Sequence, residues 1–184
     1  MDKPFRPENQ SLALGNKYRL AFNRIPEVTF FCQSVNIPGV SMTPTQFATP
    51  FTDLPLPGDK IQYDEFRISF LVDEDYKSWQ SLYDWITAMT FPENFGQYRN
   101  LSQLKRNAIS LNLPSSELLD QLPQYSDAIL TINTNKNNPN IRFKFKDLFP
   151  ISVGAIELSE EFSPENTMIC DALFRYSYFT LERL

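Results

Sequence analysis

Histidine is absent from this chain of 184 residues. Such a chain lacks the usual general base, the usual partner of a serine or cysteine nucleophile and the commonest ligand of transition metals. The 5 glycines form none of the GxGxxG or P-loop patterns that cradle phosphates. Carboxylate pairs such as Asp64-Glu65 and Glu160-Glu161 carry no accompanying motif, so a carboxylate-based hydrolase is the least favoured alternative. We therefore expect no enzymatic activity, no cofactor and no metal.

Long apolar runs are also missing. No segment approaches 18 consecutive apolar residues, and the opening stretch MDKPFRPENQSL is charged and lacks the apolar core of a secretion signal. These features favour a soluble, unsecreted protein without membrane contact. There are 2 cysteines, Cys32 and Cys170, each inside an apolar strand-like run, and we expect both to be free buried thiols.

Aromatic residues are abundant, at 14% of the chain, with 16 Phe and 8 Tyr. This composition suits strands and packed interfaces better than a mostly helical protein. The length suits one domain with a substantial core. A formal net charge of -5 argues against a general binder of polyanions, although a local basic stripe stays possible.

Strand patterns dominate the chain. The runs 17–25 (KYRLAFNRI) and 27–37 (EVTFFCQSVNI) are separated by Pro26 and predict a hairpin or a sharply bent pair of strands. Segment 38–58 is rich in proline, which denies it a place in the middle of a sheet and predicts an extended arm or edge ribbon.

Three further runs complete the strand prediction. In 61–73 the alternation shifts phase around Asp64-Glu65, which predicts a β-bulge that restores one core-facing row. Segments 126–135 and 141–151 predict a hairpin. The terminal run CDALFRYSYFTLERL is apolar on both faces as a strand, so it needs a second cover, from a helix, a second sheet or another chain.

One helix is predicted, over residues 75–90. Its apolar stripe follows the i, i+3, i+4 rule and consists of Trp79, Leu82, Tyr83, Ile86, Met89 and Thr90. Trp85 lies on the flank of this stripe, where it either contacts a neighbouring chain or caps the edge of the core. The acidic cluster Asp73-Glu74-Asp75 precedes the helix and is better explained as a cap than as a metal site.

Pro92 ends this helix, and the irregular stretch 92–125 follows, with short helical segments predicted at 101–108 and 115–122. An insertion of this length usually carries function or wraps a partner.

A basic stripe stands out in the run IRFKFK, where Arg142, Lys144 and Lys146 alternate with apolar residues. The stripe is either a solvated sheet face or a charge-matched contact with another subunit or with nucleic acid. Its acidic mates in a repeated interface would be Glu157, Glu160, Glu161 and the cluster at Asp73.

Three stretches carry a family resemblance: FFCQSVNIPGVSM, LPGDKIQYDEFRISFLVDEDYKSWQSLYDWI and CDALFRYSYFTLERL. They resemble the tail tube and baseplate tube proteins of contractile-tail (myovirus) bacteriophages over about 17–91 and 151–184. The resemblance implies six-fold rings that stack into a hollow tube, with DNA as non-specific cargo in the lumen. It further implies other tail tube, sheath or baseplate proteins as partners, and a place in the virion tail after synthesis in the host cytoplasm.

The same resemblance implies the architecture. The expected fold is mainly β (α+β), a tail-tube-like β-sandwich or barrel with one flanking helix and an extended arm. We expect a single domain over 1–184, with an N-terminal tail (1–16), the arm (38–58) and the insertion (92–125). By analogy the arm reaches a neighbouring subunit, inner-sheet strands line the bore and the helix faces the sheath. The insertion departs from the simplest tube pattern.

We therefore expect a virion structural protein that forms or initiates the tail tube. The alternatives are a baseplate wedge or adaptor with the same fold, and a monomeric ligand-binding β-sandwich with the arm packed on its own domain. The predicted subunit-interface residues are Phe47, Phe51, Leu54, Trp85, Arg142, Lys144 and Lys146.

Overall fold

The computed structural model describes residues 12–90, 92–93, 96, 124–159 and 167–184. Most of its regular structure is β, as expected, with one helix of 14 residues and one of 6. The elements in chain order are β1 (Tyr18–Phe22), α1 (Pro26–Phe31), β2 (Cys32–Val35), β3 (Val40–Met42), β4 (Thr45–Ala48), β5 (Asp53–Leu56), β6 (Ile61–Tyr63), β7 (Phe66–Leu71), α2 (Lys77–Thr90), β8 (Ser126–Asn133), β9 (Pro139–Val153), β10 (Ile169–Arg175) and β11 (Tyr178–Arg183).

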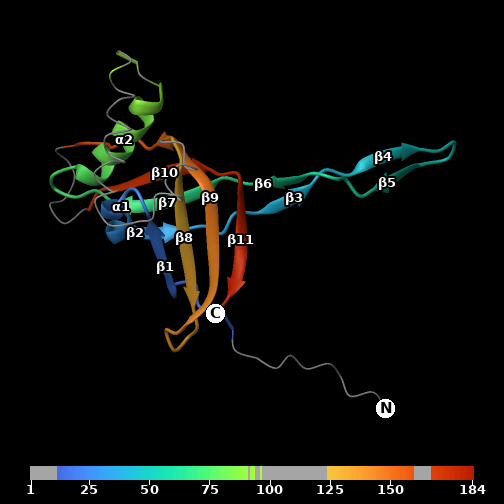
Figure 1. Ribbon diagram of the computed structural model, residues 1–184, viewed down its shortest axis with the longest axis horizontal. Coiled ribbons are helices and arrows are strands. Elements are labelled where there is room, and N and C mark those ends of the chain that lie inside the picture. Colours follow the sequence, from blue (N-terminus) through green and yellow to red (C-terminus); the bar gives the residue numbers. More distant parts are fainter. Residues whose placement is uncertain (1–11, 91, 94–95, 97–123, 160–166) are drawn as a thin grey trace, which may run out of the picture.

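A seven-stranded antiparallel sheet forms the body of the molecule, with strand order β1-β8-β9-β10-β7-β2 and β11 paired to β9. The 15-residue β9 belongs to two layers. Its first half pairs with β8 and β11, and its second half pairs with β10. In Figure 1, β1, β8, β9 and β11 run side by side, and β7 and β10 cross them. We call these the first and second layers.

Aromatic side chains fill the space between the two layers. The ring centroids of Phe66 on β7 and Phe145 on β9 lie 4.5 Å apart, and those of Phe22 and Phe174 lie 5.4 Å apart. All four rings are buried, so each contributes a large apolar area to one core. The predicted hairpin of residues 126–135 and 141–151 is confirmed as β8 and β9.

Segment 27–37 was predicted as a strand, which is confirmed for Cys32–Val35 (β2) and wrong for the residues before it. Residues 26–31 form the short helix α1, and β1 pairs with β8 rather than with the following segment. Proline is favoured in the first helical turn, where its missing N–H costs nothing. The Thr29 hydroxyl accepts a hydrogen bond from the Phe22 amide, which ties the helix to β1. These local contacts outweigh the β propensity of the run.

The phase shift at Asp64-Glu65 is not a bulge within one strand. Residues before it form β6 and pair with β3, whereas residues after it form β7 and pair with β10 and β2. The shift in alternation therefore marks the point where the chain leaves one sheet for another.

The C-terminal run is two strands rather than one strand with two apolar faces. β10 ends at Arg175 and β11 begins at Tyr178, each with its own inward row. Phe174 is buried from β10, and Phe179 packs against the core from β11. The parity change at the turn accounts for the inward position of Phe179, whereas Ile169 on β10 and Leu181 on β11 are 54% and 56% exposed.

Helix α2 begins two residues after its predicted start, but the residues on its buried face are not those predicted. The buried residues are Ser78, Leu82, Trp85 and Ala88, whereas Tyr83 is 49% exposed. Trp85 is 2% exposed, and its indole N–H donates to the Gln124 carbonyl at 3.0 Å. The prediction of a subunit contact for Trp85 is therefore wrong, because its ring belongs to the core of its own chain.

Asp73 caps α2, as the sequence predicted. Its carboxylate accepts hydrogen bonds from the amides of Lys77 at 3.0 Å and Ser78 at 2.9 Å. The hydrogen bond from the Ser78 hydroxyl lowers the pKa of this carboxyl. Among the described residues, no group of three or more His, Cys, Asp or Glu side chains is placed to hold a metal ion.

Predictions for the insertion and for the N-terminal tail fall mostly on residues that the structure does not describe. Most of the insertion 92–125, including its two short helical segments, and residues 1–11 of the N-terminal tail lie outside the described residues. Both cysteines are free, with Cys170 buried and Cys32 half-buried. Within the described ranges, no helix is long and apolar enough to cross a membrane.

Candidate subunit interface

A two-stranded ribbon projects far from the body (Figure 1). It consists of residues 40–63, with an inner part formed by β3 and β6 and an outer part formed by β4 and β5. This ribbon is the predicted arm, and it extends five residues beyond the predicted end at Gly58 because β6 belongs to it. The alternative of a monomeric β-sandwich required the arm to pack on its own body, and the ribbon does not do so.

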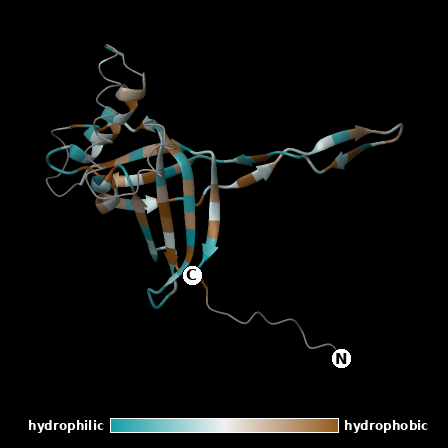
Figure 2. Cartoon of the chain, in the orientation of Figure 1, coloured by the Kyte–Doolittle hydropathy of each residue, from teal (hydrophilic) through white to brown (hydrophobic). Residues whose placement is uncertain are grey.

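The outer ribbon has one apolar and one polar face. Directly paired residues point to the same face, as do residues two positions apart on one strand. The pairs Phe47–Leu54 and Thr45–Leu56 therefore lie on one face. The other face carries Gln46, Ala48, Asp53 and Pro55. Figure 2 shows apolar segments along this projection, away from the core. All eight of these residues are exposed, so the apolar face has no cover from the part of the chain that the structure describes.

The tip of the ribbon exposes a phenylalanine. Phe51 is 98% exposed, and Phe47 and Leu54 are 58% and 48% exposed. The three predicted arm contacts thus lie together on the outer ribbon, available to another surface. Their role as subunit contacts stays a prediction. Leu56 and Ile61 were not predicted as contacts but are also exposed on the ribbon, and Leu56 follows Leu54 with a period of two.

The inner ribbon repeats this construction. Val40 pairs with Tyr63 and Met42 pairs with Ile61, while the polar pair Ser41 and Gln62 lies between them on the other face. Each part of the ribbon therefore carries an apolar row along one side.

A tight joint connects the inner and outer ribbons. A Cβ atom added at Gly58 would lie 2.0 Å from the Thr43 carbonyl oxygen. The two backbones therefore approach so closely that residue 58 must be a glycine for this geometry to persist.

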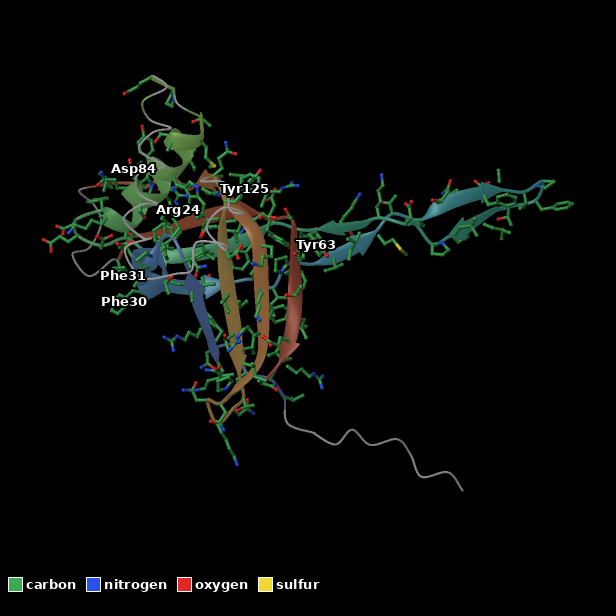
Figure 3. All side chains as sticks on the ribbon, in the orientation of Figure 1. Arg24, Phe30, Phe31, Tyr63, Asp84 and Tyr125 are labelled. Carbon is green, nitrogen blue, oxygen red and sulfur yellow. The ribbon has the colours of Figure 1, made fainter. Side chains whose placement is uncertain are left out.

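The root of the ribbon is anchored in the body by aromatic contacts. The Tyr63 ring lies 5.4 Å from that of Phe179 and 5.7 Å from that of Tyr176 (Figure 3 labels Tyr63). The Tyr176 hydroxyl donates to the Asp64 carbonyl at 3.1 Å, and burial raises the pKa of Tyr176 to about 12. The phenol therefore stays protonated and keeps this hydrogen bond.

Polar contacts complete the root. The Asn36 amide group donates to the Glu65 carbonyl at 3.0 Å and accepts from the Arg67 amide at 2.7 Å. Arg175 forms an ion pair with Glu65 at 3.1 Å. These side chains line an open cleft of about 510 Å³ together with Tyr63 and Asp64. A ribbon held in this way has a defined orientation on the body.

The first layer ends in two strands with one strand partner each. β1 pairs with β8, β11 pairs with β9, and neither has a further strand partner among the described residues. Such edges present backbone N–H and C=O groups that can pair with another chain.

The predicted basic stripe lies on the face of the first layer that points away from the core. Phe143 and Phe145 are buried, and Arg142, Lys144 and Lys146 alternate with them. The carboxylate of Glu182 on β11 forms ion pairs with Lys144 at 2.9 Å and with Arg142 at 3.5 Å. Lys146 forms an ion pair with Asp127 on β8. The hydrogen bond from Lys144 lowers the pKa of Glu182, which keeps this carboxyl ionised.

The acidic partners predicted for a repeated interface, Glu157, Glu160, Glu161 and the cluster at Asp73, stay a prediction, because ion pairs within one chain do not test them. Asp73 is engaged in capping α2, and Glu160 and Glu161 lie outside the described residues. Cross-strand neighbours supply the carboxylates within the chain, a pairing that follows from strand register and not from sequence proximity. The prediction that the stripe contacts another subunit stays a prediction.

Comparison with known proteins places these features in a family. The model of the phage tail tube protein family matches residues 8–182. The chain is 24% identical over 164 residues to the tail tube terminator protein of Enterobacteria phage T4, covering 88% of this chain and 82% of that protein.

Solved structures share the fold. A chain in the sheath-tube complex of the PVC extracellular contractile injection system matches with a TM-score of 0.61 at 10% identity, covering 95% of this chain and 94% of that one. A chain of the anti-feeding prophage cap, described as a tube terminating cap, matches with a TM-score of 0.61 at 11% identity, covering 98% and 97%. The match of the family model over nearly the whole sequence shows that this chain belongs to the phage tail tube protein family, whose members are structural parts of a tail.

Proposed function

We propose that this protein is a structural subunit of a contractile phage tail that assembles with identical copies into a ring closing the end of the tail tube. The observation that carries the proposal is the ribbon 40–63. It places an uncovered apolar face outside the body, on a root that is already fixed. Such a surface gains stability when a second protein covers it.

Assembly as a ring follows from the kind of contact that the ribbon makes. The ribbon and the body surface that receives it are different parts of the same chain, so each copy contacts the next in a head-to-tail manner. A head-to-tail interface produces either a closed ring or an open filament. The free edges of β1 and β11 support closure, because the β11 edge of one copy can add to the β1 edge of the next.

A position at the end of the tube is favoured by the curated relative. That relative is a tail tube terminator protein, and the match covers most of both chains. Tube and sheath proteins are the partners that this position implies. In the proposal the chain is made in the host cytoplasm and is incorporated into the virion tail.

The experiment compares the full chain with a variant whose outer ribbon is removed. Residues 44–57 are replaced by Asn-Gly, which suits a two-residue hairpin turn between the inner strands. Light scattering coupled to size exclusion and negative-stain microscopy measure the assembly of both proteins over a range of concentrations. We expect rings from the full chain and dispersed, folded monomers from the shortened chain.

Folding of the shortened chain is monitored by its thermal transition and circular dichroism. Because the removed residues are almost all exposed, we expect the body to keep its fold. Rings formed equally well by the shortened chain would contradict the role of the ribbon. A full chain that stays monomeric at high concentration, alone and with tube proteins, would contradict the proposed assembly.

A further inference from the structure

We propose that the outward face of the first layer binds the phosphate backbone of double-stranded DNA without regard to sequence. The face is defined by three cross-strand rows. These rows are Arg19-Thr131-Arg142-Glu182, Ala21-Ile129-Lys144-Thr180 and, from β8 to β11, Asp127-Lys146-Tyr178. Paired residues on neighbouring strands point to the same side of a sheet, so these side chains form one surface, which we call the basic face.

The charge of the basic face is opposite in sign to that of the whole chain. It holds four cations, Arg19, Arg142, Lys144 and Lys146, against the two carboxylates of Asp127 and Glu182. This surplus of two positive charges occurs in a chain with a formal net charge of -5. Lys17 and Asp147 flank the face and offset each other. A charge separation of this kind directs a polyanion to one side of the molecule.

The spacing of the cations suits a linear array of negative charges. Arg142, Lys144 and Lys146 occupy alternate positions of one strand, so the row extends over about 13 Å. Duplex DNA carries one negative charge per about 1.7 Å of its axis, or roughly eight over that length. Several phosphates are therefore within reach of one copy.

The uncharged residues of the face favour nucleic acid over a protein partner. Thr131, Thr180 and Tyr178 supply hydroxyl groups, which commonly donate to phosphate oxygens. Apolar residues on the face are limited to Ala21 and Ile129. Protein interfaces instead have an apolar centre depleted of charge, so the face lacks what another protein would need.

The ion pairs with Glu182 do not block this role; Lys146 is 44% exposed and pairs with Asp127, whose side chain is 16% exposed. The side chains of Arg142 and Lys144 are 35% and 40% exposed, and both share the single carboxylate of Glu182, which is 46% exposed. Pairs in such solvated positions contribute little stability, and a phosphate can replace the carboxylate as partner. Glu182 therefore competes with DNA for the same two cations.

The inference stands on the geometry of one chain and does not require the ring. It is tested on the dispersed full-length protein with a fluorescently labelled 30-base-pair duplex of random sequence, by anisotropy at about 50 mM salt. Two to three phosphate contacts predict that a fourfold rise in salt weakens binding by roughly 10- to 40-fold. Failure to form rings and failure to bind the duplex are thus separate results.

Two variants with equal changes in charge locate the site. Lys144→Gln with Lys146→Gln is expected to weaken binding at least about tenfold, because two phosphate contacts are lost. The control, Lys60→Gln with Lys77→Gln, alters the ribbon and α2 and is expected to change binding less than about twofold. Equal losses in the two double variants would overturn the assignment to this face.

Glu182→Gln provides a test in the opposite direction. Removing the competing carboxylate is expected to tighten binding by about three- to tenfold, a gain that misfolding cannot produce. Absence of duplex binding by the wild-type protein would overturn the inference. So would a result in which the Lys144 and Lys146 variant loses self-assembly while duplex binding is unchanged, since this would assign the face to an acidic surface of another copy.

Discussion

The body buries its aromatic side chains, whereas the ribbon exposes them. Phe66, Phe145 and Phe174 are fully buried between two layers of strands, whereas Phe51 on the ribbon is 98% exposed. Both regions are antiparallel and both alternate apolar with polar residues. The difference is that the second layer covers the first, and nothing within the described chain covers the ribbon. We therefore propose that the apolar residues of the ribbon serve association, whereas those of the body form the core.

The largest expected effect on stability comes from the body. Phe66→Ala removes a ring that packs 4.5 Å from Phe145 and also contacts Phe22 and Phe174. We expect a loss of about 3–5 kcal/mol in the free energy of unfolding, measured by chemical denaturation. A loss below about 1 kcal/mol would show that this ring is not part of the core.

The joint of the ribbon gives the next largest effect. Gly58→Ala places a methyl group against the Thr43 carbonyl, so the strands must separate at that point. We expect the joint to lose about 1–3 kcal/mol of local stability. Amide exchange of β4 and β5 should accelerate while that of β7 and β10 stays unchanged. Gly15→Ala, at an open position, is the matched control.

The cap of α2 gives a smaller, pH-dependent effect. Asp73→Ala should cost about 1 kcal/mol at pH 7, because two amides of the first turn lose their acceptor. The folded-state pKa of Asp73 is lowered from 3.8, mainly by the Ser78 hydroxyl, so its contribution is present above pH 3.8. It is lost as the pH falls through the lowered value. Denaturation of both proteins at pH 7 and pH 2 should show the difference shrinking in acid.

The smallest effect on stability belongs to the exposed side chains of the outer ribbon. Phe47→Ser with Phe51→Ser should change the free energy of unfolding by less than about 0.5 kcal/mol per site, because both side chains are already exposed. The same variant should weaken self-assembly at least about tenfold, measured by light scattering over a concentration series. A large loss of stability would contradict the separation between body and ribbon.

Local patterns in the sequence predicted much of this molecule. The proline-rich segment predicted a projecting arm, since proline excludes it from a sheet interior, and the outer ribbon contains Pro55. Alternation and a turn predicted the β8–β9 hairpin. The helix and its Asp73 cap were also predicted, because caps and helical periodicity depend on nearby residues.

Features that depend on tertiary contacts were not predicted. The side of α2 that faces the core follows from the layers beneath it, so Trp85 was placed on the flank of the apolar stripe although it is buried. The partners of Lys144 and Lys146 follow from the register of three strands and involve residues 38 and 19 positions away. The anchoring of Tyr63 by Phe179 joins segments that are far apart in the chain, and no local pattern indicates it.

The central claim is that the ribbon completes its structure only against another copy. Hydrogen–deuterium exchange of residues 44–57, followed by mass spectrometry in the dispersed and the assembled protein, tests this claim most directly. We expect rapid exchange in dispersed chains and at least about tenfold slower exchange after assembly, with little change in the amides of β7 and β10. Equal exchange of residues 44–57 in both states would contradict the account.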